Sequence, residues 1–366
     1  MSTNNRTGRK RDYVGVLSSV FAIVIGLLVG FVILLICNPS QALPGFVTIL
    51  TGAFTHGLKG VGQVFYYATP IILTGLSVGF AFKTGLFNIG TPGQFIVGAF
   101  AAVYVGIMWT GLGRIQWAVA LLAAILGGAL WGMVPGFLKA CFNVNEVIAS
   151  IMMNYIGMYM VNWIVKSYKP LFNNLRNESR NVAATAQIPK MGMDKLFPES
   201  SVGGGILLAI AAVLIIWVIL NKTTFGYELK AVGFNSDASR YAGINEKRNI
   251  IMSMVIAGAI AGMAGGLLYL AGTGKHIEIK DVLASEGFTG ISVALLGLSH
   301  PIGVLFSGLF IAYLTAGGFY LQLFEFSTEI IDIIVAVIIY FSAFALIVKT
   351  ILTRMNHKRE KGGGRT

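Results

Sequence analysis

Apolar runs of about 20 residues follow one another along nearly the whole chain, separated by short polar or glycine-rich stretches. A helix needs roughly 20 predominantly apolar residues to cross a bilayer, so each run predicts a membrane-spanning helix. The runs lie at 14–36, 60–82, 90–111, 115–138, 146–166, 204–221, 249–271, 283–299, 302–321 and 329–349. The pattern therefore predicts an all-α integral membrane protein with about ten crossings, forming a single transmembrane domain over residues 1–366.

The composition supports this fold class. Hydrophobic residues make up 55% of the chain and charged residues only 11%, and the mean hydropathy is +0.76, outside the balance typical of soluble domains. The net charge of +12 could indicate nucleic-acid binding, but most of the excess lies in the two tails and in loops beside the apolar runs. Membrane lipid and topology account for it there, so we expect no nucleic-acid partner.

Basic residues predict the orientation, because Lys and Arg accumulate on the cytoplasmic side. Both tails, 1–13 and 350–366, are rich in basic residues and are expected inside, together with the loop 222–248. The loop 167–203 is then extracellular, although it carries five basic residues against three acids. Long loops follow the charge rule less strictly. The sequence thus predicts a multi-pass protein of the plasma membrane with both termini in the cytoplasm.

Familiar catalytic and cofactor motifs are missing or incomplete. The four histidines have no spacing that could clamp a metal, and Cys37 and Cys141 are expected on opposite sides of the membrane. The segment "GTGK", Gly272–Lys275, lacks the other residues of a phosphate loop. We therefore expect no catalytic residue, no metal and no cofactor in this chain. If the chain is a transporter, it must use an ion gradient or a separate ATPase, because it lacks a phosphate loop of its own.

The first informative polar stretch is "KTGLFNIGTPGQFIVGAF", residues 83–100, where a Gly-Pro break is flanked by Asn88 and Gln94. Backbone left unpaired at membrane depth is tolerated only inside protein or beside a watery cavity. Broken helices also present positive N–H ends to neutral or anionic substrates. The break is therefore expected to face a substrate path. A cytoplasmic turn beside Lys83 is the alternative.

A second polar stretch is "NVNEVIASIMMNY", residues 143–155. Asn145 is expected to cap a helix, with Glu146 in its first turn, where a carboxylate complements the helix dipole. Ser150 and Asn154 follow at intervals of four and share a face with Glu146, and Tyr155 lies next to them. Such a stripe usually points into a bundle or a pore. The dipole alone could also explain Glu146.

Two further segments concern packing and docking. Gly258, Gly262 and Gly266 recur every four residues and predict a close helix contact. In the long loop, Ser236 can cap a short helix that begins at Asp237, with Gly243 as its stop. This helix could dock a partner, or the loop could be a solvated connector.

Four segments together resemble the permease subunits of bacterial ABC importers in the ribose and branched-chain amino acid permease superfamily. They are "GLFNIGTPGQ", "NEVIASIMMNY", "FGYELKAVGFNSDASRYAGI" and "GFTGISVALLGLSHPIGV". The resemblance is nearest to the branch that imports nucleosides with basic-membrane-lipoprotein-type binding proteins. It covers about residues 60–350. Pro92 departs from the pattern, since many relatives carry an acidic residue there, so this position leaves the substrate open.

The resemblance implies a ten-helix subunit with two related halves, and residues 95–102 and 305–312 are weakly similar. Its partners would be a second permease, either a paralogue or itself, two cytoplasmic ATPases that hydrolyse ATP, and an extracellular lipoprotein that binds substrate. The implied coupling helix comprises Asn235, Ser236, Asp237, Ala238, Ser239, Arg240, Tyr241 and Gly243. The residues expected along the nucleoside path are Phe87, Asn88, Gln94, Glu146, Asn154 and Tyr155.

Other functions remain open at this point. Simple sugars are the second substrate class. A gradient-driven transporter would need a titratable residue within a span, for which Glu329 and Asp332 are candidates. A passive channel would conduct without ATP. A membrane enzyme fits least, because no nucleophile, base and orienting group can be assembled from these motifs.

Overall fold

The structure is a computed structural model that describes residues 6–327, 330, 333–334, 336–337 and 340–341, with the backbone alone for residues 6–19 and 22. Most of the expected crossing at 329–349 and the whole tail 350–366 lie outside the described residues. Glu329 and Asp332 lie outside them as well.

Most of the described chain is helical and almost none of it is sheet, which confirms the all-α prediction. The only strands among the described residues are β1 (Phe172–Asn173) and β2 (Glu178–Ser179), which form one antiparallel hairpin. The longer helices are α1 (Arg6–Cys37), α2 (Ala42–Thr55), α3 (Gly57–Phe82), α4 (Thr91–Met108), α5 (Gln116–Phe142), α6 (Glu146–Ser167), α8 (Gly205–Lys222), α9 (Thr224–Phe234), α11 (Glu246–Tyr269), α12 (Ser285–Leu296) and α13 (Pro301–Phe319). The short elements are α7 (Met193–Leu196), α10 (Ser236–Tyr241), η1 (Thr110–Ile115), η2 (Ala184–Ala186) and η3 (Tyr320–Phe324).

Seven helices among the described residues are long and apolar enough to cross a membrane, and Ile23–Cys37 and Ala42–Thr55 are shorter apolar helical segments. The count of ten is therefore not confirmed. The expected crossing at 283–299 is wrong as a full span, because α12 has only 12 residues. At 1.5 Å per residue it extends about 18 Å, well short of the roughly 30 Å hydrocarbon core.

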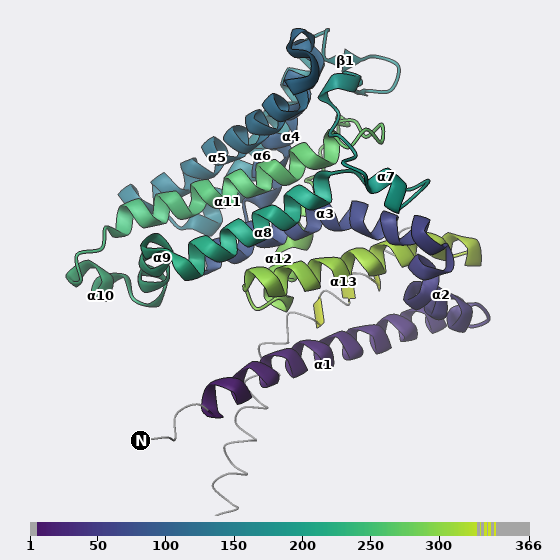
Figure 1. Cartoon of the computed structure of the whole chain (residues 1–366), viewed down its shortest axis with the longest axis horizontal. Helices are drawn as coiled ribbons and strands as arrows, with labels where there is room; N and C mark the ends of the chain where they lie inside the picture. The colour runs from purple at the N-terminus through teal and green to yellow at the C-terminus, as the bar shows by residue number, and fades with distance from the viewer. Residues whose placement is uncertain (1–5, 328–329, 331–332, 335, 338–339, 342–366) are drawn as a thin grey trace, which may run out of the picture.

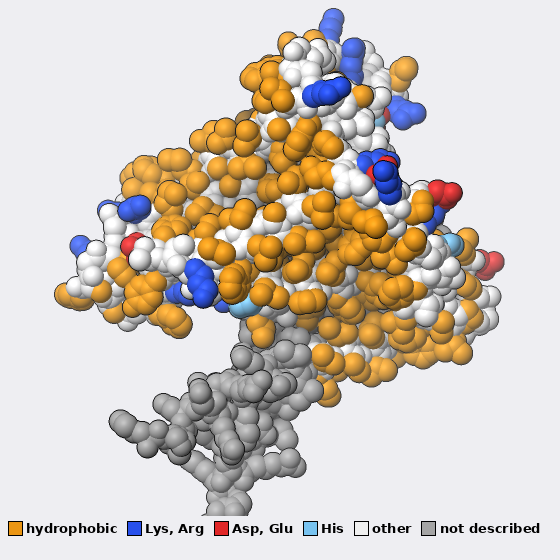
Figure 2. Space-filling model, in the orientation of Figure 1, with side chains coloured by type: hydrophobic (Ala, Val, Ile, Leu, Met, Phe, Trp, Pro, Cys, Tyr) orange, Lys and Arg blue, Asp and Glu red, His pale blue; other side chains and the backbone are white. Residues whose placement is uncertain are grey.

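The β-hairpin and helix α10 lie at opposite ends of the helical bundle (Figure 1). We call the end with the β-hairpin, α7 and the loop 270–284 the hairpin end, since the Ser179 amide donates to the Ile277 carbonyl there. The opposite end, with α9 and α10, is the α10 end. Figure 2 shows hydrophobic side chains over the flank between these ends, and Lys and Arg side chains at the ends. This distribution suits a bilayer around the flank.

The centre of the bundle is helix α11, which packs against α5, α4 and α3. A Cβ atom on Gly258 would come within 2.3 Å of the Gly128 carbonyl oxygen, and one on Gly262 within 2.3 Å of the Ala124 carbonyl oxygen. Larger residues could not occupy these positions. The predicted glycine contact is thus confirmed, and it lies between α11 and α5.

Two chain segments return into the bundle before their helices begin. Residues 83–90 lead from the α10 end of α3 to the buried start of α4, and residues 270–284 lead from the hairpin end of α11 to α12. The two helix starts meet, since a Cβ on Gly287 would lie 2.6 Å from Pro92 Cα. The interior therefore contains two helix N-termini in direct contact.

Candidate functional site

The break before α4 is built around four polar side chains, Ser77, Asn88, Gln94 and Asn154, which we call the amide network. The buried hydroxyl of Ser150 lies beside the same break and has no hydrogen-bond partner in the described chain. Asn88 Nδ2 donates to Gln94 Oε1 at 2.9 Å, and Gln94 Nε2 donates back to Asn88 Oδ1 at 3.0 Å. Asn88 Nδ2 also lies 3.3 Å from Ser77 Oγ, which donates to the Ala257 carbonyl at 2.7 Å. Asn88 and Gln94 are 0% and 1% exposed, so both amides are paired away from solvent.

Asn154 ties the start of α4 to α6. Its Oδ1 accepts the Gly93 amide hydrogen at 2.8 Å, and its Nδ2 donates to the Ile89 carbonyl at 3.0 Å. Asn154 is eight residues beyond the first residue of α6, which corresponds to about 12 Å along the helix. The break therefore lies inside the bundle, and its free backbone groups are satisfied by a side chain from a neighbouring helix.

The other expected path residues have different surroundings. Phe87 stacks on Phe82 with 5.3 Å between ring centroids, Glu146 forms a 3.1 Å ion pair with Lys139, and Tyr155 is 45% exposed. Asn145 caps α6 as predicted, accepting the Val147 amide hydrogen at 2.9 Å. The structure brings Asn88, Gln94 and Asn154 together and leaves Phe87, Glu146 and Tyr155 outside the network. Whether any of the six lines a substrate path stays a prediction.

Several cavities lie away from the amide network. A cavity of about 530 Å³, which we call the main cavity, opens between α3, α12 and α13 toward the hairpin end. Its aromatic walls are Tyr66, Tyr67 and Phe288, and its charged residues are Lys275 and Glu286. The remaining lining residues are Pro70, Ile71, Leu268, Ser285, Thr289, Ser292, Thr315 and Ala336.

An ion pair forms part of the wall of the main cavity. Lys275 Nζ lies 3.0 Å from Glu286 Oε1, and the Ser285 hydroxyl lies 3.4 Å from Glu286 Oε2. Glu286 stands in the first turn of α12, where the helix dipole stabilises a carboxylate. The pair is partly exposed, so both charges are accessible from the cavity.

A second cavity of about 280 Å³ shares Lys275, Ser285 and Glu286 with the main cavity. It is more polar and is also lined by Asn162, Glu278 and Lys280. Lys280 Nζ donates to Glu278 Oε2 at 2.8 Å, and this hydrogen bond, with the charge of Lys280, holds the pKa of Glu278 below its usual value. The ion pair Lys275–Glu286 thus lies where the two cavities adjoin.

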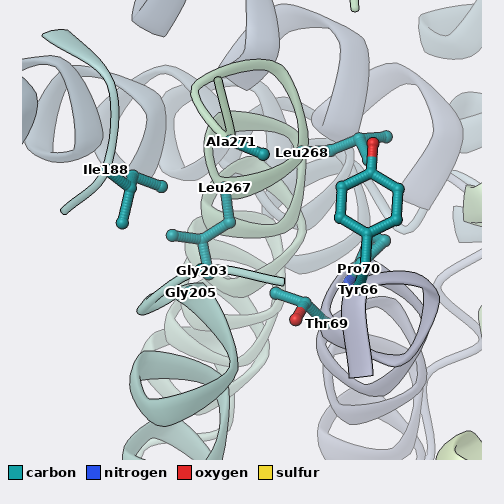
Figure 3. Close-up of a pocket in the computed structure, with 9 residues that line it drawn as sticks. All are labelled: Tyr66, Thr69, Pro70, Ile188, Gly203, Gly205, Leu267, Leu268 and Ala271. Atoms are coloured by element: carbon teal, nitrogen blue, oxygen red, sulfur yellow. The ribbon is translucent and has the colours of Figure 1, made fainter. Parts of the chain in front are cut away.

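A third, small cavity lies behind Tyr66 (Figure 3). Residues of α3, α11 and the start of α8 surround it, and the ring of Tyr66 stands beside Leu268. Tyr66, Pro70 and Leu268 also line the main cavity. Its volume of about 20 Å³ is enough for a single water and too small for a substrate.

Sequence reasoning missed the residues of the main cavity. The available signal was the spacing in α12, where Ser285, Thr289 and Ser292 recur at i, i+4 and i+7 and all line this cavity. On another face of the helix, Gly287 and Gly290 approach Pro92 and Thr74. The face of α12 toward the cavity therefore carries hydroxyl side chains, and the faces packed against α3 and α4 carry glycines.

The predicted docking helix is present as α10, Ser236–Tyr241. Its expected cap was wrong by one residue: Asn235 Oδ1 accepts the Ala238 amide hydrogen at 2.9 Å, and Ser236 is already helical. An Asn one residue earlier in extended backbone reaches this amide, so it takes the capping position. Gly243 has a φ of 80°, which agrees with the predicted stop. Phe234, the last residue of α9, is 91% exposed, and Tyr241, the last residue of α10, is 95% exposed.

Comparison with known proteins decides the class. The family described as the permease component of branched-chain amino acid transport systems matches residues 60–343. The chain belongs to this permease family. It is 38% identical to the guanosine ABC transporter permease protein NupP of Bacillus subtilis, over 93% of this chain and 96% of that protein. No solved structure matches the chain.

Other relatives of this permease are named for different substrates. The nucleoside ABC transporter permease protein NupB of Lactococcus lactis is 34% identical over 96% of the chain and 95% of its own length. The glucose ABC transporter permease protein TsgB13 of Haloferax volcanii is 31% identical over 81% of the chain and 78% of its own length. NupQ, a second guanosine permease protein of the same Bacillus, is 29% identical over 68% of the chain and 77% of its own length. The permease is thus a multi-pass membrane protein related to nucleoside and sugar permeases.

Proposed function

We propose that the chain is the membrane-spanning subunit of an ABC importer that carries nucleosides. The observation behind this proposal is the 38% identity to a guanosine permease over nearly the full length of both chains. The second nucleoside relative, at 34% identity, supports the same substrate class. Glucose is the second candidate substrate, because a glucose permease matches at 31% identity over a smaller share of the chain.

The hairpin end is extracellular and the α10 end is cytoplasmic in this proposal. Basic residues in both tails and in the loop 222–248 support that orientation. The main cavity then opens toward the outside, where a lipoprotein binding component would deliver the substrate. The second permease subunit is a paralogue, a pairing suggested by the presence of NupP and NupQ in one organism.

Helix α10 is the contact for a cytoplasmic ATPase. Two large aromatic side chains are almost fully exposed here, Phe234 just before α10 and Tyr241 at its last residue, and Arg240 provides a charge on the same short helix. Exposed aromatic and Arg side chains are typical anchors of protein interfaces. Closure of the ATPases on ATP would move α10 and, through α9 and α11, the helices around the path. ATP is hydrolysed by the partner, and this chain itself binds no cofactor.

Reconstitution in vesicles tests the function directly. The permease, its paralogue, the ATPase and the binding protein should take up labelled guanosine only when ATP is inside the vesicles. Uptake driven by an ion gradient alone would favour the secondary-transporter alternative, and flux through the purified chain without partners would favour a channel. If unlabelled glucose inhibited the uptake of labelled guanosine more strongly than unlabelled guanosine did, a sugar would be favoured as the substrate.

The docking role of α10 is tested by alanine substitution of Arg240 and Tyr241. The double variant should insert into membranes but lose both uptake and co-purification of the ATPase. Leu175→Ala is the matched control for co-purification, because Leu175 is also 95% exposed but lies in the β-hairpin at the opposite end. Normal uptake with normal co-purification in the double variant would refute the docking role.

A further inference from the structure

The main cavity has the size and the charge balance of a site for a neutral, partly aromatic molecule. Ligand pockets usually measure roughly 300–1,000 Å³, and the main cavity has about 530 Å³. Its only charged lining residues in the described chain are Lys275 and Glu286, which neutralise each other at 3.0 Å. No unpaired positive charge in this lining would hold a phosphate, so an uncharged ligand fits better than a nucleotide.

The ion pair leaves the carboxylate of Glu286 with capacity to accept hydrogen bonds. A carboxylate offers about four lone-pair positions and donates nothing when ionised. Lys275 approaches Oε1 at 3.0 Å, the Ser285 hydroxyl makes a long 3.4 Å contact with Oε2, and the backbone N–H of Glu286 also donates to this carboxylate. A group with two adjacent hydroxyls could therefore donate to this carboxylate without displacing Lys275. Hydrogen bonds to a charged acceptor are also stronger than neutral ones.

The lining of the cavity also includes aromatic side chains. Tyr66 and Tyr67 stand edge to face with 5.4 Å between centroids, and the hydroxyl of Tyr66 is held at 3.1 Å by the Thr273 hydroxyl. Phe288 is on α12, in the helix turn that also carries Glu286. A flat heterocycle gains stacking contacts against such rings beyond its buried area. Thr289 and Ser292 also line the cavity, and the Thr289 hydroxyl donates to the Ser285 carbonyl at 3.0 Å.

We propose that the main cavity is a ribonucleoside subsite, in which Glu286 accepts hydrogen bonds from the 2′- and 3′-hydroxyls of ribose and the base stacks on Tyr66, Tyr67 or Phe288. This assignment rests on the proposed nucleoside function and adds a preference for ribonucleosides over 2′-deoxyribonucleosides. A 2′-deoxyribonucleoside lacks one of the two donors, so part of the carboxylate stays unpaired in its complex. Sites that pair a substrate hydroxyl reject the analogue that lacks it, and here we expect a preference of about tenfold.

The test compares uptake of guanosine with uptake of 2′-deoxyguanosine by the complete importer in vesicles. Each nucleoside is supplied at a concentration that saturates the binding protein, and the uptake ratio is compared among permease variants so that the binding protein's own preference cancels. Glu286→Gln should reduce the guanosine-to-deoxyguanosine ratio about tenfold relative to the wild type. Glu199→Gln is the matched control, because Glu199 also pairs with a lysine, Lys59, at the hairpin end but does not line the cavity. Its ratio should equal that of the wild type.

A second measurement does not depend on transport by the Glu286 variant. In a chain with Cys37 and Cys141 replaced by Ser, Ser292→Cys should react with a small polar thiol reagent. Guanosine should slow this reaction at a concentration about tenfold lower than 2′-deoxyguanosine. Asn174→Cys, in the exposed hairpin, should react without protection by either nucleoside.

The outcomes separate the two proposals. A wild-type importer that takes up no nucleoside with ATP would refute the proposed function itself. An importer that takes up guanosine, but whose Glu286→Gln variant keeps the wild-type ratio, would refute the subsite and leave the function intact. Equal protection of Ser292→Cys by the two nucleosides, or none, would also refute the subsite.

Discussion

The amide network and the main cavity are both polar clusters inside an apolar bundle, but they satisfy their polar groups in opposite ways. In the network, Asn88, Gln94 and Asn154 are almost completely buried and hydrogen-bond each other or nearby backbone. In the cavity, Lys275 and Glu286 pair with each other and stay partly open to solvent. Polar residues within a membrane protein therefore need not mark a path. In our proposal, the remaining capacity for hydrogen bonds distinguishes the binding cluster from the structural one.

The two regions are joined by helix α12. Its polar face lines the main cavity, while Gly287 on another face touches the backbone of Pro92 at the start of α4. Pro92 is two residues before Gln94 of the network. A substrate that moves α12 would therefore press directly on the segment that the network holds in place.

The largest effect is expected where the two regions touch. Gly287→Val would place its side chain on the Pro92 backbone, with the Cβ alone at 2.6 Å from Pro92 Cα. Backbone cannot move aside as a flexible side chain does. The free energy of unfolding should therefore fall by about 3 kcal/mol or more, at the upper end for overpacking. Thermal unfolding in detergent would measure it. Gly111→Val is the control, since Gly111 has open space around it, and an equal loss in both variants would contradict the contact.

A smaller loss is expected within the network. Asn154→Ala would leave the Gly93 amide hydrogen and the Ile89 carbonyl without their partner in a buried site. Unpaired buried groups of this kind cost about 1–3 kcal/mol each, so the variant should unfold at a clearly lower temperature. Asn162→Ala removes a hydrogen bond to the Lys280 carbonyl at the exposed hairpin end and serves as the control. Similar unfolding temperatures for the two variants would contradict the stabilising role of the buried hydrogen bonds of Asn154.

Removal of one partner from the polar pair in the main cavity should change the stability of the protein much less. Lys275→Ala removes the partner of Glu286, but water in the open cavity can solvate the remaining carboxylate. We expect a change of about 1 kcal/mol or less in the free energy of unfolding, comparable to Lys59→Ala at an exposed pair. A loss of stability as large as that caused by Asn154→Ala would mean that the cavity is closed to water. The cavity and the amide network would then not differ in their exposure to solvent.

The smallest effect concerns pH. The pKa of Glu278 is lowered by its hydrogen bond to Lys280, so the folded state gains stability above the carboxyl's ordinary pKa and loses it as pH falls through the lowered value. Because the pair is exposed, the gain should be under about 1 kcal/mol. Glu278→Gln should therefore unfold slightly earlier than wild type at neutral pH and equally at strongly acidic pH. A difference that grows on acidification would contradict the assigned direction.

Local signals predicted local structure well. The apolar runs gave the positions of α3, α4, α5, α6, α8, α11 and α13 within a few residues, because each run is both long and bounded by polar residues. Asn145 was recognised as a cap, and Gly258 and Gly262 as a packing contact, since their roles depend on neighbouring positions in one helix. The cap of α10 was missed because Asn235 and Ser236 are both good capping residues and only the backbone decides between them.

Long-range features could not be read from the sequence. The run at 283–299 is apolar enough for a full span, but hydropathy cannot tell that the chain first returns into the bundle and leaves only α12 helical. Tyr66 and Glu286 lie far apart in the sequence and line one cavity only because α12 packs beside α3. Asn88 and Gln94 were recognised as important amides, but their pairing with each other depends on a fold that spacing does not reveal.

The most direct test of the contrast is thiol accessibility at one position in each region. Thr289→Cys in the main cavity and Asn88→Cys in the amide network are introduced singly into a chain whose Cys37 and Cys141 are replaced by Ser, and labelled with a small polar reagent in membranes. When no ATP is bound to the partner ATPase, we predict rapid labelling at position 289 and little labelling at position 88. Guanosine should slow the labelling at position 289. Reactivity of Asn88→Cys that guanosine suppresses, with an inert Thr289→Cys, would place the substrate at the amide network and contradict this account.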